Sequence, residues 1–212
     1  MVIRLGLARG PEDALSQCVR RSGWEPVFWA VTELRPVETP APCARARAAL
    51  VLSPAGARAA RLPKGMPCLV TGEATGRALA GHEVHISPEP RAEGMWEALR
   101  RRYPEGGDFL LIRGERSRGY LEDAAQGTPW RLHPWITHQE APLDPVPARP
   151  ELDGVLALSP LQAEVMAPLT RDVLRFAWGE RAAAAFEAAG APAHAFCAPR
   201  PEELGRILAA YL

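Results

Sequence analysis

Two segments of the sequence place a serine and a proline directly after an apolar run. Leu50–Leu52 leads into Ser53-Pro54, and Leu156–Leu158 leads into Ser159-Pro160. A serine followed by a proline is a typical start of a helix, so the strand before it would end at the same point. A hydroxyl group can cap a helix and still contact a ligand, which makes both serines candidates for binding polar groups.

Arginines and glycines follow other apolar runs in the same position. Arg9 and Arg113 each come before a glycine, and Gly72 and Gly179 each come before a glutamate and a helical pattern. Arginine side chains bind carboxylates and phosphates, and the backbone N–H groups at a helix start favour the same anions. An anionic ligand would therefore meet hydroxyls, backbone N–H groups and arginines at these turns.

Common motifs of nucleotide binding, nucleophilic catalysis and metal binding do not occur in the sequence. Neither Ser53 nor Ser159 has the flanking glycines of a nucleophile elbow, and no Walker A or G-x-G-x-x-G motif follows an apolar run. The five histidines and four cysteines lack the close spacing of metal ligands. His133 and His138 flank Trp135 in an extended segment that would bring them to a ligand. The sequence predicts no metal and no cofactor.

The composition is that of a folded protein. Its 212 residues are 47% hydrophobic and carry no net charge, which disfavours both disorder and nucleic-acid binding. No apolar run is long enough to span a membrane, and Glu12 and Asp13 follow the first run too closely for a signal peptide. The scattered cysteines are expected to be reduced thiols. These features predict a cytoplasmic protein that binds neither membranes nor nucleic acids.

Apolar runs alternate with helical patterns along the chain. Strands are expected at residues 2–7, 27–31, 50–52, 68–70, 84–86, 109–112, 155–158, 175–178 and 193–196. Helices are expected between them, the first with Pro11 in its first turn. The proline-rich segments 34–42 and 141–150 are interpreted as connectors. The alternation predicts an α/β fold in which parallel sheets are flanked by helices.

The second half of the chain repeats the first. The Ser-Pro, Gly-Glu and Arg-Gly turns and the closing helices each occur twice, at offsets of about 104–109 residues. Four matches in one order indicate a duplication that gives two similar lobes. The units run A-B-A′-B′, so A can pair with B or with B′. In both cases the turns would lie beyond the carboxyl ends of the strands, where parallel sheets bind ligands.

Taken in order, these segments resemble the uroporphyrinogen-III synthase family. The resemblance rests on the turns at Ser53, Gly72–Thr75, Arg113-Gly114, Ser159 and Gly179, and it covers nearly the whole chain. It implies two discontinuous lobes, residues 1–34 with 143–212 and residues 38–136, that face a common cleft. A two-stranded linker near residues 35–37 and 137–142 would join them.

The resemblance also implies a reaction on the route to heme. The family cyclises hydroxymethylbilane, a linear tetrapyrrole with carboxylates on every ring, to uroporphyrinogen III. Loss of the terminal hydroxyl gives an azafulvene, and a spiro intermediate then inverts the last ring. The implied enzyme is a cyclising lyase that acts as a monomer without a cofactor. The alternative is a two-lobed module that binds an anionic small molecule or a tetrapyrrole without turnover.

The same resemblance assigns roles to individual residues. The family often has a tyrosine in the second linker strand, where this sequence has Thr137, and His138 beside it is the other candidate for assisting loss of the hydroxyl. The residues expected to bind the substrate are Arg9, Ser53, Gly72, Thr75, Arg113, Gly114, Ser159, Gly179 and Arg181.

Overall fold

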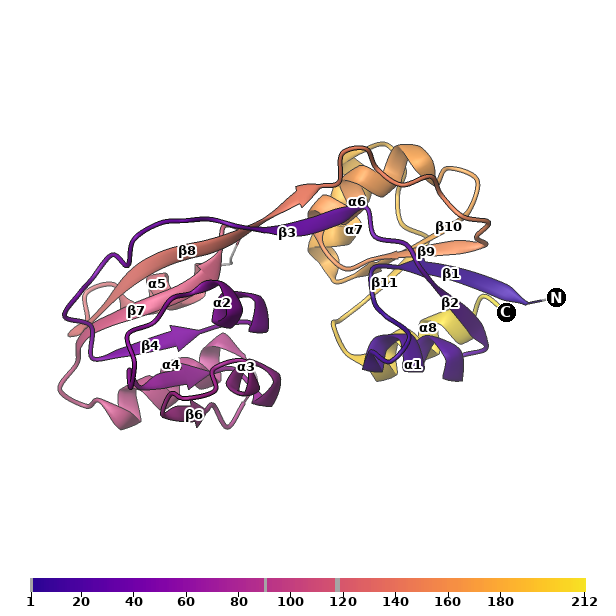
Figure 1. Cartoon of the computed structure of the whole chain (residues 1–212). Helices are drawn as coiled ribbons and strands as arrows, with labels where there is room; N and C mark the ends of the chain where they lie inside the picture. The colour runs from indigo at the N-terminus through magenta and orange to yellow at the C-terminus, as the bar shows by residue number, and fades with distance from the viewer. Residues whose placement is uncertain (1, 90, 117–118) are drawn as a thin grey trace. The chain divides into compact units, whose positions relative to one another are not determined.

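A computed structural model describes residues 2–89, 91–116 and 119–212, and the chain in it forms two compact units (Figure 1). Unit 1 consists of Met1–Glu33 and Ala141–Leu212, and unit 2 consists of Leu34–Glu140. The chain therefore enters unit 2 from unit 1 and returns to it.

Unit 1 is built on a parallel sheet in the order β11-β10-β9-β1-β2. The strands are β1 (Ile3–Leu7), β2 (Trp24–Phe28), β9 (Gly154–Ala157), β10 (Leu174–Trp178) and β11 (Ala195–Cys197). The central strand β9 is buried on both faces: Val155 and Ala157 belong to one core cluster and Leu156 to the other. A strand that is apolar at every position fits this environment, because successive side chains point to opposite faces.

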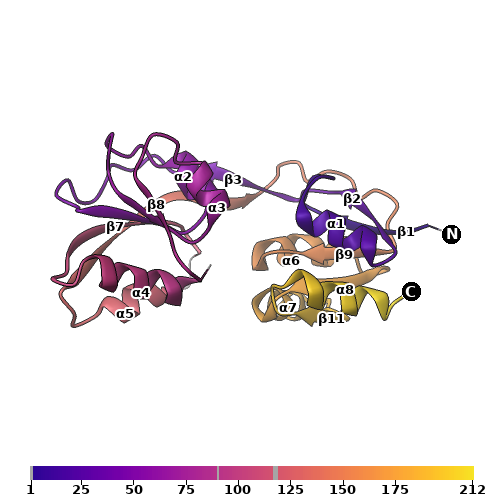
Figure 2. The same cartoon turned by 90° about the horizontal axis from the view of Figure 1, so that it is seen from below.

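Helices cover both faces of this sheet (Figures 1 and 2). They are α1 (Ala14–Arg21), α6 (Pro160–Met166), the short 3-10 helix Ala167–Leu169, α7 (Glu180–Ala188) and α8 (Pro201–Ala209). Met166 of α6 and Phe186 of α7 pack on one face, while Val19 of α1 and Leu208 of α8 pack on the other. Each face of the sheet thus has its own core.

Unit 2 contains a sheet in the order β3-β8-β7-β4-β5-β6. Its strands are β3 (Thr32–Pro36), β4 (Ala48–Val51), β5 (Cys68–Val70), β6 (Val84–Ile86), β7 (Gly107–Gly114) and β8 (Trp130–Pro142). The strands from β8 to β6 are parallel. The helices are α2 (Pro54–Ala59), α3 (Glu73–Arg77), α4 (Ala92–Arg102) and α5 (Tyr120–Ala125). Met95 of α4 and Leu121 of α5 pack on one face, and Ala57 of α2 packs on the other.

The two sheets have the same strand order once the sequence repeat is applied. β9, β10 and β11 of unit 1 take the places of β4, β5 and β6 of unit 2, and β1 and β2 take the places of β7 and β8. β1 and β2 thus pair with β9 to β11 and not with β4 to β6. The predicted α/β class with parallel sheets flanked by helices is confirmed.

β3 and β8 form a ribbon at the edge of the second sheet. The N–H of Val37 donates to the carbonyl of Thr137 at 2.8 Å, and the N–H of Leu143 donates to the carbonyl of Val31 at 3.0 Å. Residue numbers rise on one strand as they fall on the other, so the two strands are antiparallel. The prolines of this segment are tolerated because β3 is an edge strand.

Two local expectations were wrong. Residues 27–31 do not form one strand, since β2 ends at Phe28 and β3 begins at Thr32. Trp29 and Val31 between them are apolar because they pack into the core of unit 1. Pro11 precedes the first helix and lies in a turn closed by the N–H of Asp13 and the carbonyl of Gly10 at 3.1 Å, a position that suits proline. None of the helices in the described part of the chain is long and apolar enough to cross a membrane.

Candidate functional site

The carboxyl ends of neighbouring parallel strands bring several expected residues of unit 2 to one edge of the sheet. β4 ends just before Ser53, β5 ends before Gly72, and β7 ends at Arg113 and Gly114. These strands are neighbours in the sheet, because β4 lies between β7 and β5. This is the edge at which parallel α/β sheets bind ligands.

Ser53 is the N-cap of α2. Its backbone is extended, and its Oγ accepts a hydrogen bond from the N–H of Gly56 at 3.1 Å, with Pro54 at the first helical position. Ser159 caps α6 in unit 1 in the same way, accepting from the N–H of Gln162 at 3.1 Å. The cap uses one lone pair of the hydroxyl oxygen, so the Ser53 hydroxyl still carries a proton that it can donate.

A pocket of about 280 Å³ lies beside Ser53 within unit 2. It collects four of the residues singled out from the sequence, although they are spread over some 85 positions of the chain, from 53 to 138. The lining residues are Leu34, Leu52, Ser53, Arg113, Gly114, Glu115, Arg116, His138 and Glu140. Ser117 and Arg118, which continue this arginine-rich loop in the sequence, lie outside the described residues.

Arg113 is held by its own loop and by the next helix. Its Nε lies 2.7 Å from Oε1 of Glu122 in α5, and its Nη1 donates to the carbonyls of Gly114 at 3.1 Å and Glu115 at 3.2 Å. The contact with Glu122 is an ion pair only, since the Nε–H does not meet hydrogen-bond geometry with any described residue. The guanidinium is thus fixed beside the pocket by Glu122 and by the two carbonyls.

A bulge in β8 brings His138 to the same place. Arg113 pairs with Ile136, but the next residue, Gly114, pairs with His138, so Thr137 is the extra residue. A bulge of this kind re-aims the side chains that follow it. The imidazole lies so close to Gly114 that a Cβ on that residue would be 2.8 Å from Nε2 of His138. Glycine at position 114 therefore makes room for the ring.

The environment of His138 favours the neutral imidazole. Its pKa is lowered from the ordinary value of 6.5 because burial penalises the charged form. Nδ1 lies 3.2 Å from Oγ1 of Thr137, whose side chain is buried. When the Thr137 hydroxyl donates to Nδ1, the ring proton is on Nε2, the nitrogen that faces Gly114 at the pocket.

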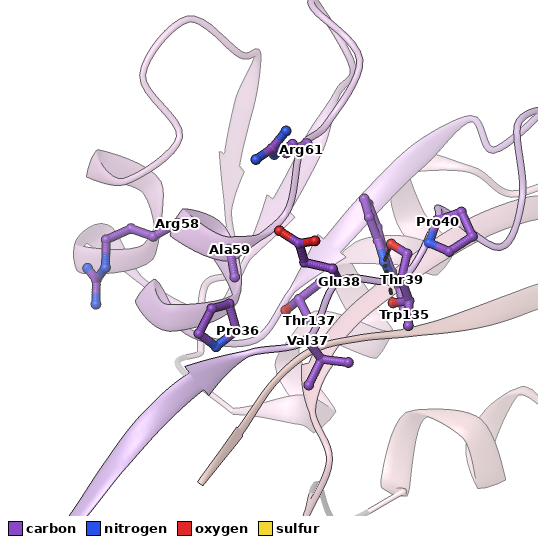
Figure 3. Close-up of a pocket in the computed structure, with 10 residues that line it drawn as sticks. All are labelled: Pro36, Val37, Glu38, Thr39, Pro40, Arg58, Ala59, Arg61, Trp135 and Thr137. Carbon is purple, nitrogen blue, oxygen red and sulfur yellow. Dashed lines mark hydrogen bonds between the residues drawn. The ribbon is translucent and has the colours of Figure 1, made fainter. Parts of the chain in front are cut away.

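A second pocket of unit 2, of about 510 Å³, lies next to Thr137 (Figure 3). The segment from Pro36 to Pro40 forms one wall, and Trp135 fixes that segment by donating its indole N–H to the carbonyl of Thr39 at 3.0 Å. Arg58 and Arg61 supply positive charge on the opposite wall, while Glu38 supplies negative charge. Figure 3 shows that Arg58 extends away from Glu38, so the two side chains do not neutralise each other.

In unit 1, the expected residues also follow the carboxyl ends of their strands. Arg9 follows β1, Ser159 follows β9, and Gly179 with Arg181 follows β10. Gly179 has a φ of +100°, which residues with a side chain rarely adopt. Apart from its neighbours in the chain, no described atom lies within 4 Å of the position that its Cβ would take. Arg9 lies 3.9 Å from Asp13 and is half exposed, while Arg181 is exposed. The unit thus offers two cations and a capped helix at this edge.

Two further sequence candidates lie elsewhere. Thr75 is inside α3 and only 3% exposed, so its side chain is directed into unit 2. His133 lies on β8 opposite Leu110, near the amino-terminal half of β7, and hydrogen-bonds to Asp108. Sequence reasoning missed Glu122 and Glu140, because neither belongs to a motif. Glu122 pairs with Arg113 and Glu140 lines the pocket, and both reach these positions through the packing of α5 and β8 beside the loop at Arg113.

Each unit thus contains a sheet of mainly parallel strands, and the turns at the carboxyl ends of these strands match between the units. A model of the family described as "Uroporphyrinogen-III synthase HemD" matches residues 13–205 of this chain. The chain belongs to the uroporphyrinogen-III synthase family. The match spans both units and includes the turns at Ser53, Gly72, Arg113, Ser159 and Gly179. The resemblance stated from the sequence is confirmed, and with it a role in tetrapyrrole biosynthesis.

Solved structures of uroporphyrinogen III synthases have the same fold. The enzyme of Helicobacter pylori 26695 aligns over 100% of both chains with a TM-score of 0.66 at 11% sequence identity. A mutant of the Thermus thermophilus enzyme aligns over 99% of this chain and 97% of that chain, with a TM-score of 0.52 at 20% identity. No match was found among curated protein sequences. At these identities the structural likeness shows the fold.

Proposed function

We propose that this protein is a cyclising lyase that converts hydroxymethylbilane to uroporphyrinogen III with loss of water and inversion of the last ring. The family match over residues 13–205 carries the proposal. The site agrees with it chemically, because hydroxyl, guanidinium and backbone N–H groups are suited to a substrate with many carboxylates. The reaction also needs no resident cofactor, since the electron pair of the pyrrole nitrogen expels the hydroxyl group.

Each unit has its own set of carboxylate-binding groups in this proposal. Unit 2 offers Ser53, Arg113 and the backbone at Gly114, and unit 1 offers Arg9, Ser159, Arg181 and the backbone at Gly179. The task of such groups is to hold one folded conformation of the linear chain, because the free azafulvene also closes without inversion. Positioning of this kind can lower a barrier by several kcal/mol, roughly 7–11 in favourable cases.

His138 is the residue that we assign to the departing hydroxyl. Its Nε2–H can donate a hydrogen bond into the 280 Å³ pocket while Thr137 occupies Nδ1. The proton balance closes within the substrate: the pyrrole N–H is lost as the azafulvene forms, and the hydroxyl leaves as water. A neutral imidazole is therefore sufficient, since the group only stabilises the hydroxyl as the C–O bond breaks.

The alternative is a protein that binds a tetrapyrrole without turnover. One observation favours it: Thr137 stands where the family often has a tyrosine, and its side chain is buried. The Thr137 side chain is short and only 2% exposed, so we assign the loss of the hydroxyl to another group. A catalytic role of His138 would therefore distinguish the lyase from a protein that only binds a tetrapyrrole.

The deciding experiment generates hydroxymethylbilane in situ and measures the isomer ratio of the oxidised porphyrins by chromatography. The enzyme should shift the product from the type I isomer to type III. His138→Gln, whose side-chain amide can still donate a hydrogen bond, should retain more activity than His138→Ala. A product that stays type I with the wild-type protein would contradict the lyase, and tetrapyrrole binding without turnover would then support the alternative.

A further inference from the structure

A second polar cluster of unit 2 lies at the amino-terminal edge of the same sheet. Asp108 is the second residue of β7, whereas Arg113 and Gly114 are its last two. At about 3.3 Å per residue, the two ends of the strand are roughly 20 Å apart. The cluster is therefore separate from the pocket at Ser53 and His138.

The cluster joins three segments of the chain. Oδ1 of Asp108 lies 2.8 Å from Nε2 of His133, which is on the neighbouring strand β8. Cys43 comes from the loop before β4, and its Sγ lies with a nitrogen of His133 and an oxygen of Asp108 in a group whose members are all within 4.8 Å of one another. The same loop is tied to β7, since the N–H of Arg47 donates to the carbonyl of Asp108 at 2.8 Å.

We propose that Cys43, Asp108 and His133 bind a zinc ion that fastens the loop before β4 to strands β7 and β8. The three donors are a sulfur, an imidazole nitrogen and a carboxylate oxygen, a set that zinc binds and that magnesium and calcium do not prefer. Two anionic ligands would balance the charge of the ion. Three protein ligands leave the fourth tetrahedral position to water.

The donor separations are close to those of a tetrahedral site. Zinc–ligand distances of about 2.0–2.3 Å place neighbouring donors roughly 3.3–3.8 Å apart. The separations of up to 4.8 Å in the cluster need to close by about an ångström, and the 2.8 Å contact between Asp108 and His133 needs to open by less than that. All three side chains are partly exposed, so these adjustments and the entry of an ion do not require unfolding.

Arg131 is the group that competes with the ion. Its Nε donates to Oδ1 of Asp108 at 2.9 Å and its Nη2 donates to Oδ2 at 2.8 Å. The side chain is 63% exposed, so the Nε–H can donate to water once it leaves Asp108. Zinc at Oδ1 would replace the hydrogen bonds between this oxygen and His133 and the Nε–H of Arg131, and it would bind His133 itself. Arg131 would keep its bond to Oδ2. A hydrogen bond to the second oxygen is a usual support for a carboxylate that binds a metal.

The other cysteines differ from Cys43 in their surroundings. Cys18, Cys68 and Cys197 are buried, and burial raises the pKa of the Cys68 and Cys197 thiols to about 11. A metal-binding thiol must lose its proton, so these two are poor ligands. Cys43 is partly exposed and has an imidazole and a carboxylate beside it. Thiolate coordination to this chain should therefore come from Cys43.

Cobalt(II) titration of the metal-free wild-type protein tests the proposal. Cobalt replaces zinc in such sites, and a cysteine ligand gives an intense thiolate-to-metal absorption band in the near ultraviolet. We expect this band, its loss on addition of zinc, and a melting temperature of unit 2 that rises with zinc. Cys43→Ala should abolish the band, and His133→Ala should weaken binding by more than about tenfold, the scale of losses around metal sites.

His85→Ala is the matched control, because His85 and Glu83 form a surface histidine–carboxylate pair outside the cluster, 2.8 Å apart. Its titration should equal that of the wild type. Absence of the thiolate band in the wild type, or an unchanged band in Cys43→Ala, would overturn the proposal and leave the cluster a hydrogen-bonded network. Porphyrin isomer formation should be the same in Cys43→Ala as in the wild type, so failure of the zinc site is distinguishable from failure of the proposed activity.

Discussion

Gly114, the last residue of β7, lies against the imidazole ring of His138. A Cβ on residue 114 would lie 2.8 Å from Nε2 of His138 and 3.3 Å from its Cδ2. The register shift between Arg113 and Gly114 creates this contact, because it pairs Gly114 with His138 and leaves Thr137 out. The glycine is thus required by the ring beside it and not by its backbone, since Gly114 is not among the glycines with positive φ.

Substituting Gly114 should therefore act through His138. Gly114→Ala should lower kcat by about 10- to 100-fold, because displacing a catalytic group by about an ångström has effects of this size. The measurement is the rate of type III isomer formation. In a His138→Ala background the same substitution should have little further effect, since the ring that it displaces is gone. Additive losses in the double variant would show that Gly114 acts independently of His138.

Gly10 offers a control for that substitution. It also follows an arginine at the end of a strand, but a Cβ on it would meet no atom within 4 Å. Gly10→Ala should leave the rate of isomer formation and the melting temperature unchanged. A loss of activity equal to that of Gly114→Ala would show that an added methyl group disturbs both Arg-Gly turns, and that the effect at Gly114 does not depend on His138.

Ser53 should contribute to both stability and binding, and two variants separate the contributions. Ser53→Ala removes the cap on Gly56 and should lower the free energy of unfolding by about 1 kcal/mol, measured by denaturant titration. Ser53→Asp keeps the cap, because aspartate is an equally good N-cap residue, but it places a negative charge where substrate carboxylates are proposed to bind. It should restore stability and raise KM. An unchanged KM in Ser53→Asp would remove Ser53 from the binding site.

The ion pair between Arg113 and Glu122 gives a test of whether the guanidinium binds substrate. Their side chains are 17% and 23% exposed, so each shields the other from water. Arg113→Gln should raise KM about tenfold or more, the loss expected for a charge-assisted hydrogen bond. Glu122→Gln should leave KM unchanged or lower it, because it frees the cation for the substrate. Equal increases in KM for both variants would indicate that the pair only orders the loop.

His194 should make unit 1 less stable in mild acid. Its Nδ1 accepts a hydrogen bond from the N–H of Arg175 at 3.0 Å, and only an unprotonated nitrogen can accept. Burial, and secondarily the nearby charge of Arg175, lower its pKa below the ordinary value of 6.5. The folded state thus binds fewer protons than the unfolded state, so the contribution of His194 is complete above about 6.5 and is lost as the pH falls through the lowered pKa.

Thermal unfolding measured at several pH values checks this prediction. The melting temperature of unit 1 should fall as the pH is lowered from about 7.5 toward about 5 by more than carboxylate titration accounts for. His194→Asn, whose side-chain oxygen can accept the same hydrogen bond without titrating, should show a flatter profile over that range. A wild-type profile that matches the variant would contradict the role of the histidine.

Much of the local structure could be predicted from the sequence. The expected strands 68–70 and 84–86 coincide with β5 and β6, because short apolar runs between glycines and charged residues have few alternatives. Ser53-Pro54 and Ser159-Pro160 also cap their helices as expected, since both residues favour that position for local reasons. The segment 27–31 could not be divided from the sequence, because Trp29 and Val31 are apolar for tertiary packing and not for strand pairing.

The sequence by itself determined which residue types follow each strand, and the repeat determined that the two sheets have equivalent turns. These are local properties, governed by hydrophobic alternation and by helix capping. Only the tertiary structure decided which of these residues meet. The bulge in β8 brings His138 to Gly114, α5 brings Glu122 to Arg113, and the pairing of β7 with β8 brings His133 to Asp108. The register shift in β8 and the packing of α5 involve residues far apart in the chain, and a shift of one residue is enough to change which side chains meet.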